Sequence, residues 1–191
     1  MSTNSVVAYL NEDGSVVSSY VHYDGYETGV GMMLLEHYNT DKCARDLAST
    51  LGYASSLSET VAESHADRVH TDEPEMFDSM TEFETYLMDN SHLEFGYLWT
   101  GGKWMVASWT TTVEGTGPYA EYNSTWNGFH WLVTSFVREG RKTVDRFRDR
   151  ALEDNREGRT EYDEFADELE VTVDKWHRYG MGEIASEAMA A

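Results

Sequence analysis

The chain has 191 residues, 40% of them hydrophobic, and its 35 acidic and 14 basic side chains give a formal charge of −21. This length and composition suit one folded domain, alone or with a helical extension, and no apolar stretch is long enough to cross a bilayer. The single cysteine, Cys43, excludes an internal disulfide and a cysteine-based zinc site, while the charge opposes direct contact with nucleic-acid phosphates.

The acidity has three interpretations, which charge alone does not separate. It keeps the protein soluble, it adapts the chain to a salty interior, or it forms a surface that imitates a polyanion or steers the chain onto a basic partner. Only four of the fourteen bases are lysines, which favours the second interpretation. The lone cysteine and the lack of a signal-peptide pattern in residues 1–5 predict a protein of a reducing cytoplasm.

The chain opens with a predicted β-hairpin. Residues 6–10 and 16–23 are rich in β-branched and aromatic side chains, and Asp13 and Gly14 between them suit a tight turn. A short apolar helix is predicted for residues 32–38.

Capping signals predict three further helices. Thr40 is the predicted N-cap of a helix over residues 41–51, and Ser56 is that of a helix over residues 57–63. Ser79 is the predicted N-cap of a helix that passes through Leu87. Gly52 follows the first of these helices at a position that favours a left-handed residue. Residues 64–78 show little periodicity and are predicted to form a loop.

A second hairpin is predicted over residues 93–99 and 103–109, because two aromatic strands flank Gly101 and Gly102. Residues 114–128 read as a turn-rich connection that holds one more strand, near residues 119–122.

The remaining sequence has a helical composition. The predicted helices cover 129–137, 141–155 and 161–179, with breaks at Gly140 and Gly158 and a fraying end at 181–191. The fold class that follows is α+β: two β-hairpins form a small antiparallel sheet with packed helices. The predicted division is a core domain over residues 1–128 and a C-terminal helical arm over residues 129–191.

One segment resembles a known set of proteins. Tyr20-Val-His-Tyr-Asp-Gly-Tyr26 is followed by Gly29-Val-Gly31 and then by Leu34-Leu-Glu-His-Tyr38. Together with the later aromatic hairpin, this pattern resembles widespread small, uncharacterised proteins that bacteriophages and prophages encode. The resemblance covers residues 6–60 and 92–107. It implies a viral origin, and hence the cytoplasm of an infected host cell, but it brings no catalytic residues.

His22, Asp24 and His37 form the sharpest candidate for a ligand or metal site. Residues two apart on a strand share a face, so the imidazole of His22 and the carboxylate of Asp24 are expected to point the same way. His37 on the following helix is a candidate third ligand, which would give a set that zinc or iron accepts. The alternative is structural, because Asp-Gly is also a turn signature.

Other signs of catalysis are weak. Gly29 and Gly31 lack the third glycine of a dinucleotide fingerprint, since Leu34 stands there, and no Walker motif or Gly-x-Ser-x-Gly elbow is present. Cys43 falls inside a predicted helix, which favours an inert thiol. We therefore predict no cofactor and favour a non-enzymatic function, with an enzyme left open.

An acidic segment covers the middle of the chain. Eleven acids and one base, Arg68, lie between Glu59 and Glu94. One interpretation is a solvated loop and helix face, and the other is a recognition surface for the basic groove of a partner. In the second case the partner-binding candidates are Glu59, Glu63, Asp67, Asp72, Glu73, Glu75, Asp78, Glu82 and Glu84.

The C-terminal part carries two oppositely charged stretches. Six bases lie between Arg138 and Arg150, and six acids lie between Glu161 and Glu170. An antiparallel pair of helices explains both stretches. Self-association into a homo-oligomer through these helices, or contact with a protein partner, is the alternative.

The leading functional hypothesis is a phage-encoded acidic interaction protein that binds and inhibits or redirects a host protein, for example one with a basic nucleic-acid-binding groove. Two alternatives stay open. One is a small-molecule or metal-dependent enzyme at His22, Asp24 and His37. The other is a structural component of a virus particle, whose partner is a viral protein. No membrane partner is expected.

Overall fold

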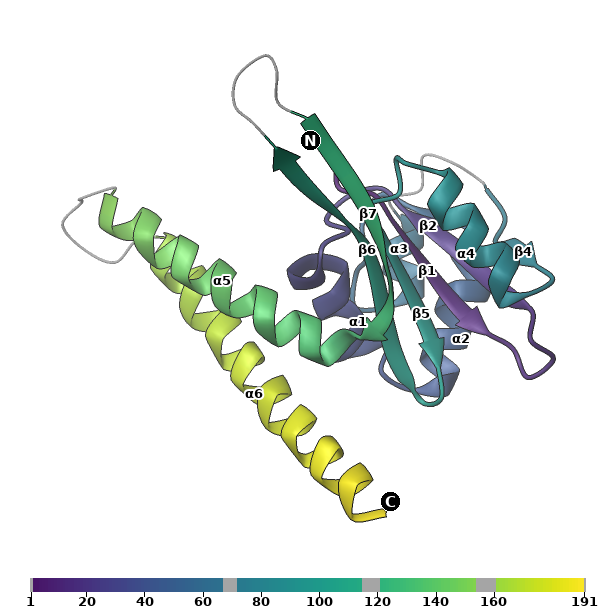
Figure 1. The fold of residues 1–191 in the computed structure, drawn as a ribbon. Coiled ribbons are helices and arrows are strands. Elements are labelled where there is room, and N and C mark those ends of the chain that lie inside the picture. Colours follow the sequence, from purple (N-terminus) through teal and green to yellow (C-terminus); the bar gives the residue numbers. More distant parts are fainter. Residues whose placement is uncertain (1, 67–71, 115–120, 154–160, 191) are drawn as a thin grey trace. The chain divides into compact units, whose positions relative to one another are not determined.

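The structure, a computed structural model, describes residues 2–66, 72–114, 121–153 and 161–190. The chain divides into two compact units, Met1–Trp131 and Leu132–Ala191. The sequence-based division ends the first part slightly earlier, at residue 128, because it takes residues from 129 onward as helical. Figure 1 shows the elements of both units.

The first unit is built on a seven-stranded mixed sheet. Its strands are β1 (Ser5–Leu10), β2 (Val16–Val21), β3 (Tyr53–Ala54), β4 (Glu75–Phe77), β5 (Phe95–Thr100), β6 (Lys103–Glu114) and β7 (Glu121–Trp131). The strand order is β3-β2-β1-β5-β6-β7, and β4 also pairs with β2.

The α+β class is confirmed, and both predicted hairpins are present as β1–β2 and β5–β6. The sheet is larger than two hairpins, however, and it is not purely antiparallel. The hairpins are joined through a parallel pairing of β1 with β5, in which Val7 lies opposite Tyr97. Residues Val6–Tyr9 are all buried, as expected for a central strand that is covered on both faces.

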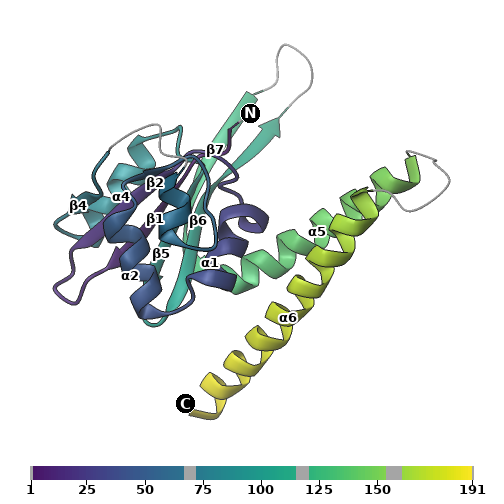
Figure 2. The same ribbon diagram turned by 180° about the vertical axis from the view of Figure 1, so that it is seen from behind.

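Helices cover both faces of this sheet. α1 (Met32–His37) and α2 (Asp41–Thr50) lie on one side, and α4 (Met80–Asp89) lies on the other (Figures 1 and 2). On the α2 side, the hydroxyl of Ser19 donates a buried hydrogen bond to the carbonyl of Ala48. On the α4 side, an apolar cluster joins strands and helix: Val6, Ala8, Val16, Phe77, Phe83, Leu87, Leu93 and Leu98.

Gly96 allows α4 to approach the sheet closely. A Cβ atom at this position would lie 2.7 Å from Cδ1 of Leu87, which is closer than real side chains approach. Gly96 is buried in the middle of the sheet, so the missing side chain creates the space into which Leu87 packs.

Two of the predicted helix starts are confirmed. The hydroxyl of Thr40 accepts a hydrogen bond from the amide of Cys43, and Ser79 caps α4 by accepting from the amide of Glu82. Gly52 has the predicted left-handed conformation, with φ of 65°. These signals are local, so they can be read from a few neighbouring residues.

The third predicted helix start is wrong. α3 spans Val61–Ala66, and its first turn is capped by Thr60, whose hydroxyl accepts from the amide of Glu63. Thr60 and Glu63 repeat the capping-box spacing that also occurs at Ser56. The backbone of Ser58 is instead held by tertiary contacts, because its carbonyl accepts from the Tyr38 hydroxyl and its amide donates to Ser64.

The junction between the two units also differs from the prediction. β7 continues through Trp131, where a helix from residue 129 was expected, because it remains paired with β6: Met105 lies opposite Trp131 and Val106 lies opposite His130. The first helix of the second unit, α5 (Leu132–Glu153), runs through Gly140 without a break. Gly140 is buried in that helix. The predicted break at Gly158 lies outside the described residues.

The second unit pairs α5 with α6 (Glu161–Ala190). Arg148 donates to Asp167 and to Glu170, and the ring of Phe147 packs against Phe165 at a centroid distance of 4.6 Å. The predicted pairing of the basic with the acidic helix is therefore confirmed. The helix continues to Ala190, beyond the predicted end at residue 179.

None of the helices in the described part of the chain has both the length and the apolar character that a bilayer span requires.

Candidate functional site

The nine predicted partner-binding acids fall into four groups. Asp67 lies outside the described residues. Two others serve their own helices, since Glu63 accepts from the Thr60 hydroxyl and Glu82 accepts from the amide of Asp78. Three acids line one cleft: Asp72, Glu73 and Glu75. The remaining three, Glu59, Asp78 and Glu84, do not line it. The structure therefore gathers part of the predicted acidic surface at a single place.

This cleft has a volume of about 460 Å³ and opens at the edge of the sheet. The outer edge of β2 is shared by two short strands: β4 pairs with Val16–Ser18, and β3 pairs with Tyr20–Val21. Neither strand covers the full length of β2, and α4 lies above this edge. The lining residues are Val6, Ser18, Tyr20, Gly52, Tyr53, Asp72, Glu73, Glu75 and Tyr86.

Three tyrosines from three separate elements supply the aromatic wall of the cleft. The rings of Tyr20 and Tyr53 are stacked, with centroids 5.5 Å apart and an interplanar angle of 29°. Their position follows from the register, because Tyr20 on β2 lies directly beside Tyr53 on β3. Tyr86 comes from α4 and is held against the sheet by Phe77, at a centroid distance of 5.0 Å.

The hydroxyls of Tyr20 and Tyr86 stay protonated at neutral pH, because the pKa of each is raised. Burial raises the pKa of Tyr86 well above its ordinary value, and the carboxylate of Glu75, to which the hydroxyl donates, raises it further. Burial also raises the pKa of Tyr20, and Tyr53 adds to that effect. The cleft consequently combines aromatic rings and hydroxyl groups with the side chains of three acidic residues, and none of the residues described around it is basic.

His22 extends the aromatic wall beyond the cleft. Its Nδ1 atom lies 3.0 Å from the Tyr20 hydroxyl, and its ring packs against those of Tyr23 and Tyr53, at centroid distances of 4.4 and 6.4 Å. Tyr23 is 48% exposed. His22 is thus a member of an aromatic row that leads out of the cleft toward solvent.

Asp24 and His37 do not join His22 in a common site. Asp24 adopts a left-handed conformation with φ of 58°, and its carboxylate accepts from the Tyr26 hydroxyl at 3.0 Å. His37 is exposed at the end of α1. Within the described residues, no group of three or more His, Cys, Asp or Glu side chains is arranged to hold a metal ion. The ligand role predicted for these residues therefore gains no support from their geometry.

The turn that contains Asp24 is tightly packed. A Cβ atom on Gly25 would lie 2.6 Å from the carbonyl oxygen of Thr3, and one on Gly29 would lie 2.2 Å from the carbonyl oxygen of Asp24. A single π-helical turn, Glu27–Gly31, follows. Packing therefore requires glycine at positions 25 and 29.

The tyrosines are the residues that sequence reasoning missed. Tyr20, Tyr53 and Tyr86 are three of twelve tyrosines and lie far apart in the chain, so no local pattern connects them. The only signal available was the alternation of Tyr20 with His22 on a predicted strand, which places both side chains on one face. Chemically, the cleft suits a cation, because aromatic faces and carboxylates both attract guanidinium and ammonium groups.

No protein-family model, no curated protein and no solved structure matches this chain.

Proposed function

We propose that the protein is an acidic binding module that captures a basic side chain of a partner protein in the tyrosine-lined cleft. The observation that carries this proposal is the composition of the cleft: Tyr20 and Tyr86 face it together with Glu73 and Glu75, and no basic residue is among its described lining. A cleft with this lining repels anions and has little affinity for purely apolar groups. A guanidinium group, in contrast, can stack on the tyrosine rings of the cleft and pair with its carboxylates.

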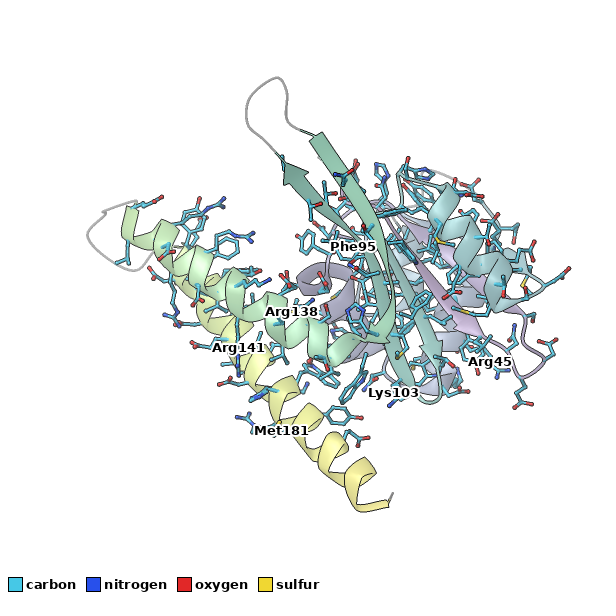
Figure 3. The ribbon with its side chains drawn as sticks, in the orientation of Figure 1. Arg45, Phe95, Lys103, Arg138, Arg141 and Met181 are labelled. Atoms are coloured by element: carbon cyan, nitrogen blue, oxygen red, sulfur yellow. The ribbon has the colours of Figure 1, made fainter. Side chains whose placement is uncertain are left out.

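The protein already contains one pairing of this kind, on the opposite face of the sheet. Arg45, labelled in Figure 3, lies over the ring of Tyr9 at 4.7 Å from the centroid and donates to the Tyr9 hydroxyl at 2.7 Å. The Tyr9 hydroxyl in turn donates to Asp41. Tyrosine, carboxylate and guanidinium thus form one connected group. In the cleft, Tyr86 and Glu75 repeat the tyrosine and the carboxylate, and the proposed partner supplies the cation.

The acids outside the cleft have a separate role in this proposal. Glu59, Asp78 and Glu84 belong to the same acidic segment but do not line the cleft. Together with the net charge of −21, they attract a basic partner over a distance and orient it before contact. Their contribution is screened by salt over about 8 Å at physiological ionic strength, whereas contacts inside the cleft are screened less.

The resemblance to phage proteins suggests the identity of the partner. A phage-encoded protein with an acidic recognition surface acts most directly on a basic host protein in the cytoplasm of the infected cell. If the partner's basic groove binds nucleic acid, occupation of that groove inhibits or redirects it. This extension rests on analogy, and the chemistry of the cleft can be tested without it.

The first test uses a peptide that contains two arginines separated by glycines, and a matched peptide with citrulline, which has nearly the same shape without the charge. Calorimetric titration of the full chain should detect binding of the arginine peptide at low salt, and weaker binding as salt rises. Equal affinities for the two peptides would overturn the proposal.

A pair of charge-matched variants then locates the binding site. Glu75→Gln and Glu59→Gln each remove one negative charge, but only Glu75 lines the cleft. Glu75→Gln should weaken binding of the arginine peptide about tenfold, equivalent to ~1.4 kcal/mol, and Glu59→Gln less than about twofold. The same two variants serve in capture of proteins from a host lysate, where a true partner is lost only with Glu75→Gln.

A further inference from the structure

The hairpin of β6 and β7 extends beyond the rest of the sheet. β5 pairs with β6 only from Lys103 to Ser108, whereas β6 and β7 remain paired out to Glu114 and Glu121. Residues 109–114 and 121–126 therefore form a two-stranded ribbon, and β7 is the last strand of the sheet. Side chains on both faces of the ribbon are exposed: Thr110, Thr111, Thr112, Val113, Asn123, Ser124 and Thr125.

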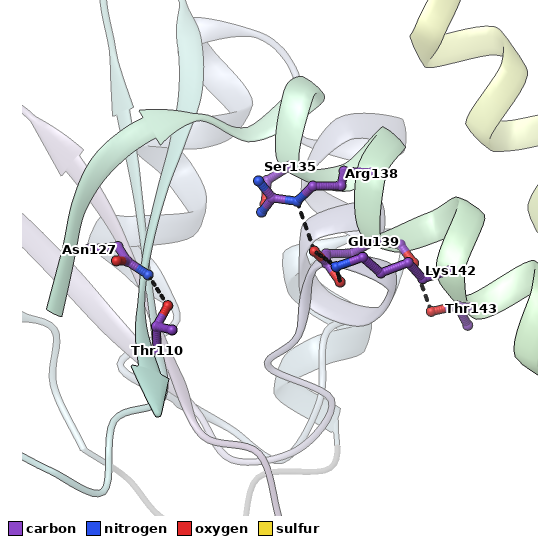
Figure 4. Close-up of polar contacts among 7 residues, drawn as sticks. All are labelled: Thr110, Asn127, Ser135, Arg138, Glu139, Lys142 and Thr143. Atoms are coloured by element: carbon purple, nitrogen blue, oxygen red, sulfur yellow. Dashed lines mark hydrogen bonds and ion pairs between the residues drawn. The ribbon is translucent and has the colours of Figure 1, made fainter. Parts of the chain in front are cut away.

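Apart from Glu114 and Glu121 at its outer end, this ribbon is uncharged, in contrast to the rest of the chain. No Asp, Glu, Lys or Arg residue occurs from Trp104 to Val113 or from Tyr122 to Val137, and the second range contains one histidine, His130. In the whole chain, 26% of the residues are charged. Its polar side chains bond to one another instead. The hydroxyls of Thr111 and Ser124 lie 2.9 Å apart, and Asn127 donates to Thr110 (Figure 4).

An edge strand of this composition is unprotected. Proteins commonly guard exposed edges with lysine, proline or bulges that prevent another strand from pairing. β7 contains no lysine, arginine or proline, and the one irregularity in its pairing lies near its base, between Val106 and Ser108 of β6. A two-stranded ribbon is also only marginally stable in water without further partners.

We infer that β7 pairs with β7 of a second copy of this chain, antiparallel about a two-fold axis, so that the two sheets become continuous. The distribution of charge along the chain indicates which partner pairs with the β7 edge. A basic partner gains nothing from a neutral edge, whereas two chains that each carry −21 repel one another everywhere except where charge is absent. Antiparallel pairing of a strand with itself is self-complementary, as a two-fold interface requires.

A second observation supports an occupant at the ribbon. The indole N–H of Trp109 is buried and has no acceptor in the described part of the chain. It borders a hollow of about 420 Å³ whose lining includes Thr111 and Ser124. The hollow is also lined by Ser91, Glu94 and Phe95, and pairing with a second copy gives the outer edge of β7 its missing backbone partners.

Sedimentation equilibrium of the full chain tests the inference. The expected result is a dimer of twice the 21.8 kDa chain mass, and its dissociation constant should fall as salt rises, since salt screens the repulsion between like-charged copies. The proposed binding of a basic partner has the opposite salt dependence, so the two proposals fail separately. A monomer at every concentration and salt overturns this one.

Two substitutions across one hydrogen bond provide a matched comparison. Ser124→Asp and Thr111→Asp each replace one of the two bonded hydroxyls with a carboxylate and add one negative charge, but Ser124 is on the outer strand and Thr111 on the inner one. Ser124→Asp adds a negative charge to the paired strand of both copies and should weaken the dimer at least tenfold. Thr111→Asp should weaken it about twofold, and an equal effect of both would overturn strand pairing at β7.

Cysteine scanning identifies the axis. In a Cys43→Ser background, single cysteines at positions 123–127 should form a disulfide-linked dimer most efficiently at the position nearest the axis, because only there do the two copies of one residue face each other. Thr111→Cys is the control on the inner strand. Cross-linking at positions 123–127 that does not exceed this control would contradict the inference.

Discussion

The hydroxyl of Tyr97 donates a buried hydrogen bond of 2.8 Å to the carbonyl oxygen of Gly25. This bond ties β5 to the turn that follows β2. Burial raises the pKa of Tyr97 well above its ordinary value, and the nearby carboxylate of Glu27 raises it further. The folded first unit therefore requires the neutral form of this side chain.

The free energy of unfolding should fall as pH rises above about 10, the ordinary pKa of tyrosine. The folded-state pKa of Tyr97 is raised, so its contribution is fully present below the unfolded-state pKa and is lost as pH rises toward the folded-state value. Above pH 10, Tyr97 alone should remove about 1.4 kcal/mol per pH unit. Urea denaturation between pH 8 and pH 11 measures this loss.

Tyr97→Phe separates this tyrosine from the others. The variant should be less stable than the parent at pH 8 by about 1–2 kcal/mol, because the carbonyl of Gly25 loses its donor. The difference should shrink as pH rises from 10 to 11, since only the parent must keep this hydroxyl protonated. If the two proteins differ in free energy of unfolding by the same amount from pH 8 to pH 11, the Tyr97 hydroxyl does not have this role.

Gly96→Ala should destabilise the first unit by about 1–3 kcal/mol, because the added methyl group overlaps Leu87. Gly128→Ala is the control: Gly128 lies on β7 of the same sheet, and a Cβ atom there meets nothing within 4 Å. Urea midpoints of the two variants should therefore differ clearly. If both lose the same stability, the cost lies in the strand backbone and not in the contact with α4.

Tyr9→Phe should destabilise the fold by about 1–2 kcal/mol, because a nearly buried hydroxyl loses its bonds to Asp41 and Arg45. The ring itself keeps its place, so far-ultraviolet circular dichroism should not change. Tyr23→Phe is a suitable control, because Tyr23 is exposed. Equal stability of the parent and Tyr9→Phe would show that water replaces these bonds without cost.

Tyr20→Ala and Tyr20→Phe should differ in their affinity for the arginine peptide. The alanine variant loses the ring that stacks on Tyr53 and should bind about fivefold to thirtyfold more weakly, as expected for a lost cation–π contact. The phenylalanine variant keeps the ring and loses only the bond to His22, so its affinity should remain within about twofold. Equal losses would place the cation outside the aromatic wall.

The parts of the fold that were predictable from the sequence are those that neighbouring residues determine. Thr40 and Ser79 cap their helices through amides three residues away, and the turn at Gly101 and Gly102 needs positive φ angles that the residues themselves favour. The parallel pairing of β1 with β5 depends on segments about 90 residues apart, and no local pattern encodes it.

The candidate site shows the same division. The acids at 72–75 were predicted from composition, but the cleft exists only because β3, β4 and α4 meet at β2. At Gly140 a local signal was misleading. Glycine is a weak helix former, so a break was predicted there, but Gly140 is buried inside the continuous helix α5. The end of β7 was misplaced because Phe129 and Trp131 suit a strand and a helix equally well until the pairing with β6 is known.

The order of strands has a consequence for valency. The cleft lies at the β2 edge and β7 closes the other edge, so a dimer joined at β7 carries its two clefts at the far ends of one sheet. The two clefts are separated by four strand-to-strand spacings from β2 to β7 in one copy, one spacing across the junction, and four more in the second copy. At about 4.8 Å per step this is roughly 40 Å. A partner with two basic segments then binds by avidity only if about twelve or more extended residues separate them.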